Sequence, residues 1–481
     1  MTKPTDLLTF RRVFPIVLLT MIFVLAVRQS VSLDPDLWWH LKTGQQILDT
    51  RSIPHTDDFS FTKQGSDWVA HEWLSEVIME IIYRLGGFAG LVTIFSLVIV
   101  SALWLTYRRC EGQPYVAGIA ILLAAAASSP LFGIRPQMLT LLLASIYIVL
   151  LERFSPKQGI RQLWLLVPLM LLWVNLHAGF ALGLGLIGLY IVRAGLDGEW
   201  AHLRPLLIVL VVCTAVVPLN PNGFRMFSYP YETLTSTSMA AFIQEWASPD
   251  FHKVTYLPLA ILLLSTFGAM ALSPRRARLG ELFLVLITAL GALRSARHIP
   301  IFSLFAAPAL ARNLWAIATS RGWDKLLTGE EIRPTFIKLL INVVLLLAPF
   351  VLAGSRVWHF ATHLRNYESI RNPVAAVEFL RAKGLPGPVY NRYGWGGYLI
   401  YHLYPSYRVY IDGRADVYGD AFFAESVKIY DGLDDGRNSF DRYGIKTVFI
   451  APDAALATRL KADSNWRVVY QDDQAIIFTR L

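Results

Sequence analysis

Two carboxylates, Asp34 and Asp36, directly follow the first long apolar stretch of the chain. Ionisable groups at the edge of such a stretch are costly unless they are paired or solvated in a cavity. Two carboxylates this close can chelate a divalent cation, or can divide into one charged group and one with a raised pKa. Either arrangement suits deprotonation of a hydroxyl or stabilisation of a cationic transition state. The structural alternative is that Asp34, ahead of Pro35, caps the following helix.

A second polar cluster consists of His71, Glu72 and Glu76. The two glutamates are four residues apart, so they share one face of a helix. His71 can join them on a metal ion or a phosphate. The H-E-x-x-H pattern of zinc proteases is not met, because position 75 is Ser75. The structural alternative is that these residues form the solvent-exposed face of an amphipathic helix.

The composition of the chain predicts the kind of protein that positions these residues. The chain has 481 residues, of which 54% are hydrophobic and 16% are charged, whereas a soluble chain carries about 25% charged residues. A soluble or disordered protein is therefore excluded, and a polytopic membrane protein is predicted. The net charge of +9 fits the excess of basic residues in cytoplasmic loops that orients membrane proteins. The sequence has no stripe of basic and aromatic residues of the kind that binds nucleic acids. We expect no disulfide between Cys110 and Cys213.

Hydropathy predicts about eleven transmembrane helices, since a span needs roughly 20 apolar residues. The stretch that opens the chain lacks a cleavage site for a signal peptide, so we interpret it as an uncleaved first span. The windows are Phe14–Ser32, Phe88–Tyr107, Tyr115–Phe132, Met138–Leu151, Leu163–Asn175, Phe180–Val192, Pro205–Leu219, Leu257–Leu272, Leu282–Leu293, Ile299–Leu314 and Phe336–Gly354.

Basic residues alternate between the turns, which predicts the orientation. With the N-terminus in the cytoplasm, the inner segments carry most of the arginines and lysines, and the outer turns carry few. The C-terminal region is then outside. The inner basic residues are Lys3, Arg11, Arg12, Arg108, Arg109, Arg153, Lys157, Arg161, Arg193, Arg204, Arg275, Arg276, Arg278, Arg321, Lys325, Arg333 and Lys338.

This topology brings further polar residues to the outer side. Arginine and histidine together suit a phosphate or diphosphate, whereas an isolated one is more often structural. Because several converge on one side, we predict a substrate- and phosphate-binding role for them. The predicted set is His40, His71, Glu72, Arg135, Asn175, His177, Glu245, Arg297 and His298.

The predicted domains are a membrane domain over residues 1–356 and an extracytoplasmic α/β domain over 357–481. The first outer loop, 33–87, reads as two amphipathic helices lying in the membrane interface, with Trp38, Trp39, Trp68 and Trp73 as anchors. In the C-terminal domain we expect helices at Val374–Arg381 and Ala421–Tyr430. Short strands are expected at Pro388–Tyr390, Arg408–Ile411, Thr447–Ile450, Trp466–Tyr470 and Ala475–Thr479.

Two motifs of the C-terminal region are polar or glycine-rich. The run from Tyr393 to Gly397 fails the dinucleotide fingerprint G-x-G-x-x-G, because position 399 is Leu399. The run from Asp412 to Asp416 is either a ligand loop or a surface that docks against the outer membrane loops, and we favour docking.

Together these features resemble the GT-C glycosyltransferases, integral membrane enzymes that use polyprenyl-phosphate-linked sugars. The resemblance spans most of the chain, and it extends to bacterial GT-C-like membrane proteins. It rests on the runs Asp34-Pro35-Asp36-Leu37-Trp38-Trp39-His40, His71-Glu72-Trp73-Leu74, Trp173-Val174-Asn175-Leu176-His177-Ala178-Gly179 and Tyr393-Gly394-Trp395-Gly396-Gly397-Tyr398.

The resemblance implies that Asp34 or Asp36 is the catalytic acidic residue and that a polyprenyl-phosphate sugar is the donor, with membrane lipids around it. Some members hold a divalent metal, here Mg²⁺ or Mn²⁺ at Asp36, and others do not. Three alternatives stay open: an O-antigen ligase or polymerase, a transporter or flippase, and a non-catalytic envelope scaffold. A transporter would place polar groups at the bilayer midplane, often within inverted repeats.

Overall fold

The computed structural model describes residues 10–327 and 335–481. Two charges used in the topology prediction, Lys3 and Arg333, lie outside these ranges. The chain divides into two compact units, each built from three segments. Unit 1 comprises Met1–Val31, Ala89–Gly223 and Gln244–Thr362, and unit 2 comprises Ser32–Phe88, Phe224–Ile243 and His363–Leu481.

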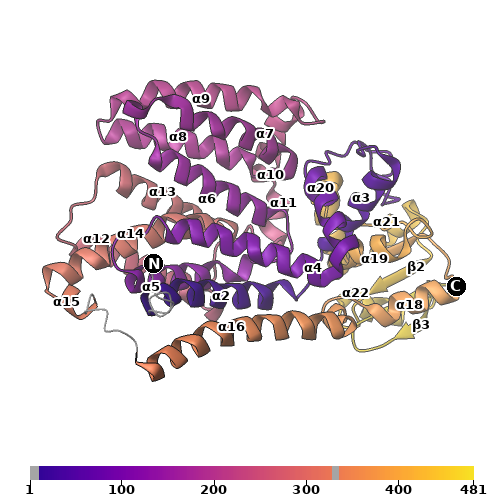
Figure 1. Ribbon diagram of the computed structural model, residues 1–481. Coiled ribbons are helices and arrows are strands. Elements are labelled where there is room, and N and C mark those ends of the chain that lie inside the picture. Colours follow the sequence, from indigo (N-terminus) through magenta and orange to yellow (C-terminus); the bar gives the residue numbers. More distant parts are fainter. Residues whose placement is uncertain (1–9, 328–334) are drawn as a thin grey trace. The chain divides into compact units, whose positions relative to one another are not determined.

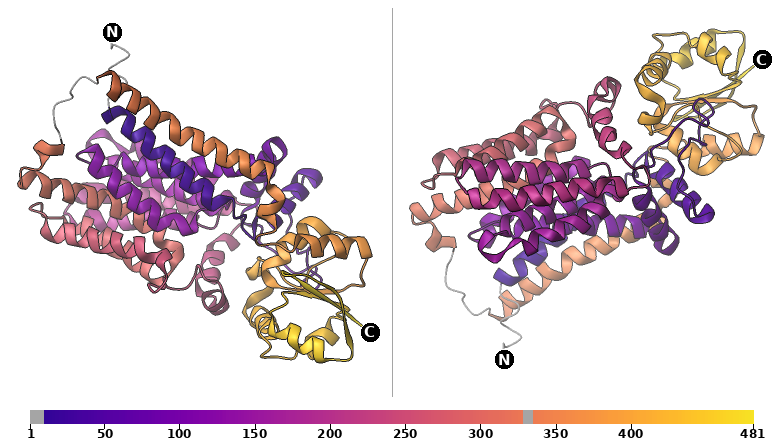
Figure 2. Two further views of the ribbon diagram at one scale, coloured as in Figure 1. Left: turned by 90° about the horizontal axis from the view of Figure 1, so that it is seen from below. Right: turned by 90° about the horizontal axis from the view of Figure 1, so that it is seen from above.

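Unit 1 is a bundle of apolar helices that run side by side (Figures 1 and 2). Helix α4 enters it from unit 2 through a kink at Gly87, where φ is 58°. The helices are α2 (Phe10–Ser30), α4 (Trp73–Tyr107), α5 (Pro114–Ser128), α6 (Gln137–Arg153), α7 (Leu166–Leu176), α8 (Phe180–Leu196), α9 (Leu203–Ala215), α12 (Leu257–Leu272), α13 (Leu279–Arg294), α14 (Ile299–Ser320), α15 (Asp324–Leu327) and α16 (Phe336–Thr362).

Helix α14 is the most buried of the long apolar helices, and it packs against α5, α12 and α13. Small side chains allow this close packing, since Ala120 and Ala124 of α5 and Ala306 and Ala307 of α14 are fully buried. Helix α2 lies beside α16 (Figure 1). Helix α16 in turn exposes most of its apolar side chains, as a helix that faces lipid does.

Within the residues that the structure describes, seven helices are long and apolar enough to cross a membrane: α2, α4, α5, α14 and α16, together with α9 and α12 and the short turns beside them. The four remaining predicted windows fall on the shorter helices α6, α7, α8 and α13. The prediction of a multi-pass helical membrane protein with a small C-terminal sheet is therefore confirmed. The count of eleven spans stays a prediction.

Unit 2 combines helices with a four-stranded sheet in the order β1-β2-β4-β3. Strands β1 and β2 are parallel, with Val389 opposite Thr447, and the other two pairs are antiparallel. The elements are α3 (Leu37–Thr50), the start of α4, α10 (Arg225–Thr235), α11 (Thr237–Phe242), α17 (Leu364–Glu368), α18 (Val374–Lys383), β1 (Val389–Asn391), α19 (Gly396–Leu403), α20 (Ala415–Tyr430), α21 (Arg437–Arg442), β2 (Thr447–Ile450), α22 (Ala455–Ala462), β3 (Trp466–Gln471) and β4 (Ile476–Arg480).

Four of the five expected strands form, and the expected strand over Arg408–Ile411 is wrong. Its residues make only isolated bridges, from Val409 to Ser60 and to Val389. The backbone N–H of Val409 donates to the carbonyl of Phe59, and that of Tyr410 donates to the side chain of Asn391. The segment therefore satisfies its backbone partly through the first loop, and no continuous ladder forms.

Helix α3 of the first loop packs on α19 of the C-terminal region, within unit 2. Trp38 is fully buried there, edge-on to Tyr398 and Phe88. Trp39 and Trp68 are buried as well. The expectation that these three tryptophans anchor the helices in the membrane interface is therefore wrong, because their rings are used in the core of unit 2.

Replacing Trp38 should test how strongly this core holds the first loop. We expect Trp38→Ala to destabilise unit 2 by about 3–5 kcal/mol, since it removes a large buried ring. Thermal unfolding of the purified protein, followed by tryptophan fluorescence and by protease protection of the first loop, measures the loss. Trp200→Ala, at a side chain that is 69% exposed, is the control. An equal effect of the two changes would contradict the core role.

Candidate active site

The acidic pair lies in the short loop that leads into α3. The carboxylate of Asp34 accepts the backbone N–H of Asp36 at 2.9 Å, which closes a local turn. Asp36 occupies the N-cap position of α3 and makes no side-chain cap bond. Instead, its carboxylate accepts the indole N–H of Trp39 at 3.2 Å. Asp34 is 7% exposed and Asp36 is half-buried, so Asp36 is the more accessible carboxylate.

Glycines of the C-terminal region let its backbone approach this loop. A Cβ atom at Gly413 would lie 1.8 Å from Oδ1 of Asp36, and one at Gly397 would lie 2.6 Å from the carbonyl oxygen of Pro35. No other residue type fits at these two positions without displacing the acidic loop. The glycine-rich run thus serves close packing, which explains why it lacks the spacing of a nucleotide-binding loop.

One helical turn after Asp36, the ring of His40 lies between two glutamates. Its Nδ1 is 3.2 Å from Oε1 of Glu76, and its Nε2 is 3.4 Å from Oε2 of Glu72. His40 is 4% exposed. Burial by itself lowers the pKa of His40, but Glu76, Glu72 and the nearby Asp36 outweigh it, so the pKa is raised above the ordinary value. The surrounding carboxylates therefore favour the charged form of His40.

The chain of charges continues through His71. Its Nε2 is 3.3 Å from Oε1 of Glu72, and its ring packs on Tyr229 with centroids 4.3 Å apart. Burial lowers the pKa of His71, but Glu72 and Asp416 outweigh it, so the pKa is raised above its ordinary value. Burial also raises the pKa of Asp416. The structure therefore brings together His71, Glu72 and Glu76, the cluster expected from the sequence, and adds His40 and Asp416 to it.

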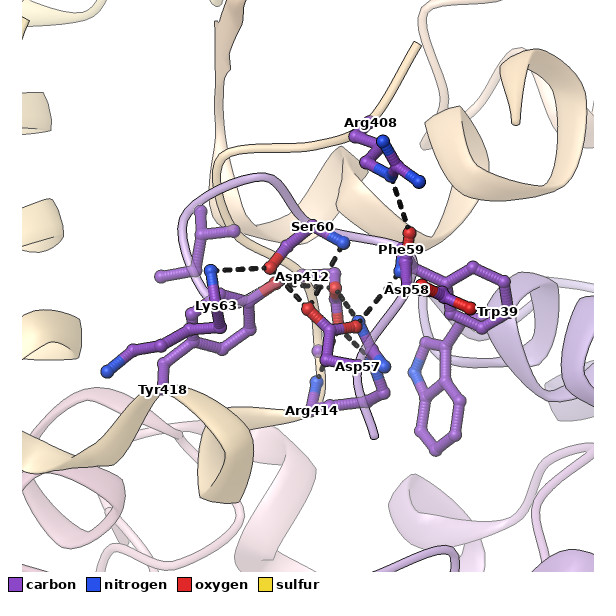
Figure 3. Close-up of polar contacts among 12 residues, drawn as sticks. Trp39, Asp57, Asp58, Phe59, Ser60, Lys63, Arg408, Asp412, Arg414 and Tyr418 are labelled. Carbon is purple, nitrogen blue, oxygen red and sulfur yellow. Dashed lines mark hydrogen bonds and ion pairs between the residues drawn. The ribbon is translucent and has the colours of Figure 1, made fainter. Parts of the chain in front are cut away.

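A buried ion network ties the first loop to the C-terminal region (Figure 3). The guanidinium of Arg414 contacts Asp412 through Nε at 2.8 Å and Nη2 at 2.7 Å, and contacts Asp57 at 2.7 Å. The hydroxyl of Tyr418 donates to Asp412 at 2.6 Å. Burial raises the pKa of Asp412, but Arg414 outweighs it and the net pKa is lowered. The expectation that this run docks against the first outer loop is confirmed.

The ring of Trp68 lies 4.6 Å from the Arg414 guanidinium, so the cation is enclosed on one side by an aromatic face. Burial, together with Asp36, Asp412 and Asp416, raises the pKa of Tyr393 well above its ordinary value. Its hydroxyl donates to the Gly413 carbonyl at 3.3 Å. Tyr393 and Gly413 thus stand beside the acidic loop.

Sequence reasoning missed Asp57, Trp39 and Gly413 as parts of this site. An acidic residue in a polar loop gives no signal by itself, and the partner of Asp57 is far away in sequence. The indole of Trp39 was assigned to the membrane interface, although its position three residues after Asp36 allowed the observed contact.

In unit 1, three predicted residues come together. Arg135 forms an ion pair with the carboxylate of Glu245. The backbone carbonyl of Glu245 accepts the N–H of Arg297 at 3.0 Å. The Arg297 guanidinium stacks over Trp246 at 4.8 Å and faces the side-chain oxygen of Gln137. Glu245 thus fixes the Arg135 guanidinium and the backbone of Arg297, and two guanidinium groups near one carboxylate leave a positive charge that can bind an anion.

The other predicted residues of unit 1 support turns. Nδ1 of His177 lies 2.9 Å from the hydroxyl of Thr140 and accepts the backbone N–H of Gly179 at 2.8 Å. The side-chain oxygen of Asn175 accepts from Asn220 at 3.3 Å. His298 follows Arg297 directly, at the start of α14. His177 and Asn175 thus hold the turn between α7 and α8 against its neighbours.

The donor set for a metal ion was tested on the described residues. Within residues 10–327 and 335–481, no group of three or more histidine, cysteine, aspartate or glutamate side chains is arranged to hold one. The carboxylates of Asp34 and Asp36 are instead engaged by a backbone N–H and an indole N–H.

The structure is similar to archaeal oligosaccharyltransferase AglB from Archaeoglobus fulgidus, with a TM-score of 0.57 and 12% identity, covering 92% of this chain and 70% of that one. It is similar to ArnT from Cupriavidus metallidurans, with a TM-score of 0.52 and 14% identity, covering 98% of both chains.

A second structure of the Archaeoglobus fulgidus oligosaccharyltransferase, in complex with Zn and sulfate, gives a TM-score of 0.51 at 12% identity, covering 96% of this chain and 73% of that one. No protein-family model matches the chain, and no curated protein matches its sequence. At such low identities the likeness concerns the fold, and the chain has the GT-C fold that its motifs predicted.

Removing the positive charge of His40 tests the histidine and glutamate chain. We expect His40→Gln to cost about 3–5 kcal/mol near pH 6, because it leaves the buried Glu76 without its histidine and removes one of the two histidines that contact Glu72. The raised pKa of His40 means that its stabilisation is complete below the unfolded pKa of about 6.5 and is lost as pH rises through the folded pKa.

Melting temperatures of the wild type and His40→Gln, measured from pH 5.5 to 9, should therefore converge as pH rises. His252→Gln, at a fully exposed histidine, is the control and should follow the wild type. A constant gap between wild type and His40→Gln across this range would contradict a titrating His40.

Removing only Arg414 from the buried ion network should destabilise the protein, whereas removing the charges of all three partners should not. Arg414→Met leaves Asp57 and Asp412 buried and uncompensated, so we expect a loss of about 3–5 kcal/mol. Adding Asp57→Asn and Asp412→Asn should recover most of that loss, since no buried charge then remains. Chemical denaturation of the three proteins measures it, and a triple variant as unstable as Arg414→Met would contradict the charge argument.

Proposed function

We propose that this protein is a membrane glycosyltransferase that transfers a sugar from a polyprenyl-phosphate donor to an acceptor on the periplasmic side of the bacterial inner membrane. The observation that carries the proposal is Asp36, a half-buried carboxylate at the start of α3, directly after the first span and held by Trp39. The solved structures with the same fold include one with a dolichol phosphate and one with undecaprenyl phosphate.

In the proposed reaction, Asp36 accepts the proton of the acceptor's hydroxyl or amide as that group attacks the anomeric carbon of the sugar. The bond from the anomeric carbon to the phosphate oxygen breaks, and the polyprenyl phosphate leaves with the electron pair. The developing positive charge on the sugar is stabilised by the carboxylate. Asp34 keeps the loop in shape through its bond to the Asp36 N–H.

The donor phosphate is assigned to Arg135, Arg297 and His298. Glu245 supports this assignment, since it holds Arg135 by its carboxylate and Arg297 by its backbone carbonyl. The ion pair fixes the Arg135 guanidinium and stacking on Trp246 orients that of Arg297, so both lose little entropy when they bind a phosphate. His40, His71 and Glu72 are then positioning residues, because the two rings lie against carboxylates and set the charge around the start of α3.

The proposed topology has eleven spans, with the N-terminus in the cytoplasm and the C-terminal region outside. It is supported by the coincidence of all eleven apolar windows with helices and by the alternation of basic residues between turns. The proposed division at residue 356 describes where the spans end. The first loop packs with the C-terminal region in unit 2, so both belong to the outer part.

The test uses two conservative variants of the purified protein with polyprenyl-phosphate sugars. We expect Asp36→Asn to lower transfer by about 10²–10⁴-fold, because an amide cannot take a proton. Asp34→Asn should keep most of the activity, since an amide oxygen still accepts the Asp36 N–H. Asp58→Asn, at an exposed residue of the same loop, is the control.

If Asp34→Asn loses transfer and Asp36→Asn keeps it, the catalytic base is Asp34. Full activity of both variants would show that neither carboxylate acts in transfer. Parallel reactions with EDTA, then with added Mg²⁺ or Mn²⁺, test a divalent cation at Asp36. Loss and recovery of transfer would support a metal-assisted reaction. Failure of well-folded protein to bind any carrier would favour a scaffold or a transporter.

A further inference from the structure

Six arginines of the turns predicted to be inside, together with Arg312 of α14, gather around one cavity of unit 1. The cavity has a volume of about 560 Å³ and lies where α4, α6 and α8 end and α13 begins, against α14. Seven arginines and four carboxylates line it, which leaves a net charge of +3. The apolar part of the wall includes Leu105, Val149 and Phe305.

Carboxylates fix the inner arginines of this cavity in place. Arg109 pairs with Glu152 through two hydrogen bonds of 2.7 and 2.8 Å, and its side chain is 7% exposed. Glu281 receives Arg312 at 2.8 Å and Arg275 at 3.0 Å. These groups are pre-organised, because planar guanidinium forks held by carboxylates lose little freedom when a further anion binds.

Positive charge remains available after these pairings. Nε of Arg312 is buried and finds no hydrogen-bond partner in the part of the chain that the structure describes. Arg108 and Arg153 are exposed, and neither pairs with a carboxylate among the described residues. Arginines that only set the membrane topology need to lie near the membrane surface, and they do not need to surround a cavity. A cavity of this size with an apolar wall and excess guanidinium is suited to an amphiphilic anion.

We propose that this cavity binds the phosphate of an anionic lipid headgroup, from the leaflet that the predicted topology places on the cytoplasmic side. The guanidinium groups would take the phosphate oxygens by charge-assisted hydrogen bonds, and the apolar wall would contact the glycerol and the first methylenes of the chains. Basic pockets between transmembrane helices are a known way to recognise such headgroups. The site is independent of the proposed sugar transfer.

The test compares two double variants that remove the same charge from the same end of unit 1. Arg108→Gln with Arg153→Gln changes arginines that line the cavity. Arg204→Gln with Arg276→Gln changes exposed arginines of neighbouring turns that do not line it. Because none of the four is an inner, paired arginine of the cavity, both proteins should fold, and thermal unfolding checks this.

Short-chain phosphatidylglycerol is titrated into the full-length protein in phosphatidylcholine micelles, and binding is followed by thermal stabilisation and native mass spectrometry. We expect saturable binding to the wild type and to the control variant. The Kd should rise by about tenfold or more in the cavity variant, given the loss of two phosphate-facing arginines.

Equal weakening in both double variants would overturn the proposal, because it would indicate general surface charge. So would equal binding of phosphatidylcholine. A third arm adds inorganic phosphate in place of phosphatidylglycerol. Protection by phosphate at the same concentrations would assign the cavity to a soluble phosphate and overturn the lipid headgroup as its ligand.

Discussion

The buried ion pair between Arg414 and Asp57 is the interaction on which the candidate site depends. It joins a loop that follows the first span to a segment near the end of the chain. Asp412 shares the same guanidinium, and the neighbouring Gly413 lies against the carboxylate of Asp36. The position of the acidic loop is therefore set by a charge network that is itself out of contact with water. Charges buried in this way are stabilising only when all of them are paired.

Much of the fold could be predicted because membrane segments are encoded locally. Each apolar window carries its own length and hydropathy, and each one coincides with a helix. The short helices α6, α7, α8 and α13 are harder to assign, because their length does not by itself distinguish a span from a buried helix. Three of the expected strands, at β1, β2 and β4, also follow local patterns of buried side chains.

The site was only partly predictable, and for a different reason. Asp36, His40 and Glu72 could be identified from residue type and spacing alone. The tryptophans of the first loop were misassigned, because an aromatic ring near a span has the same local signature whether it faces lipid or a protein core. Only the partners Tyr398 and Tyr401, about which the local sequence says nothing, decide the matter for Trp38. The same holds for Val409, whose backbone bonds to the first loop.

The three-part construction of unit 2 has a consequence for how the protein is made. Arg408 bonds to the backbone of Asp58 from 350 residues further along the chain. During synthesis the first loop must therefore wait, with Trp38 and Asp57 lacking their partners from the C-terminal region, until the last segment emerges. Contacts of such long sequence separation form slowly and leave apolar surface open to misassembly. The acidic loop therefore acquires its final geometry only after the last segment of the chain has been made.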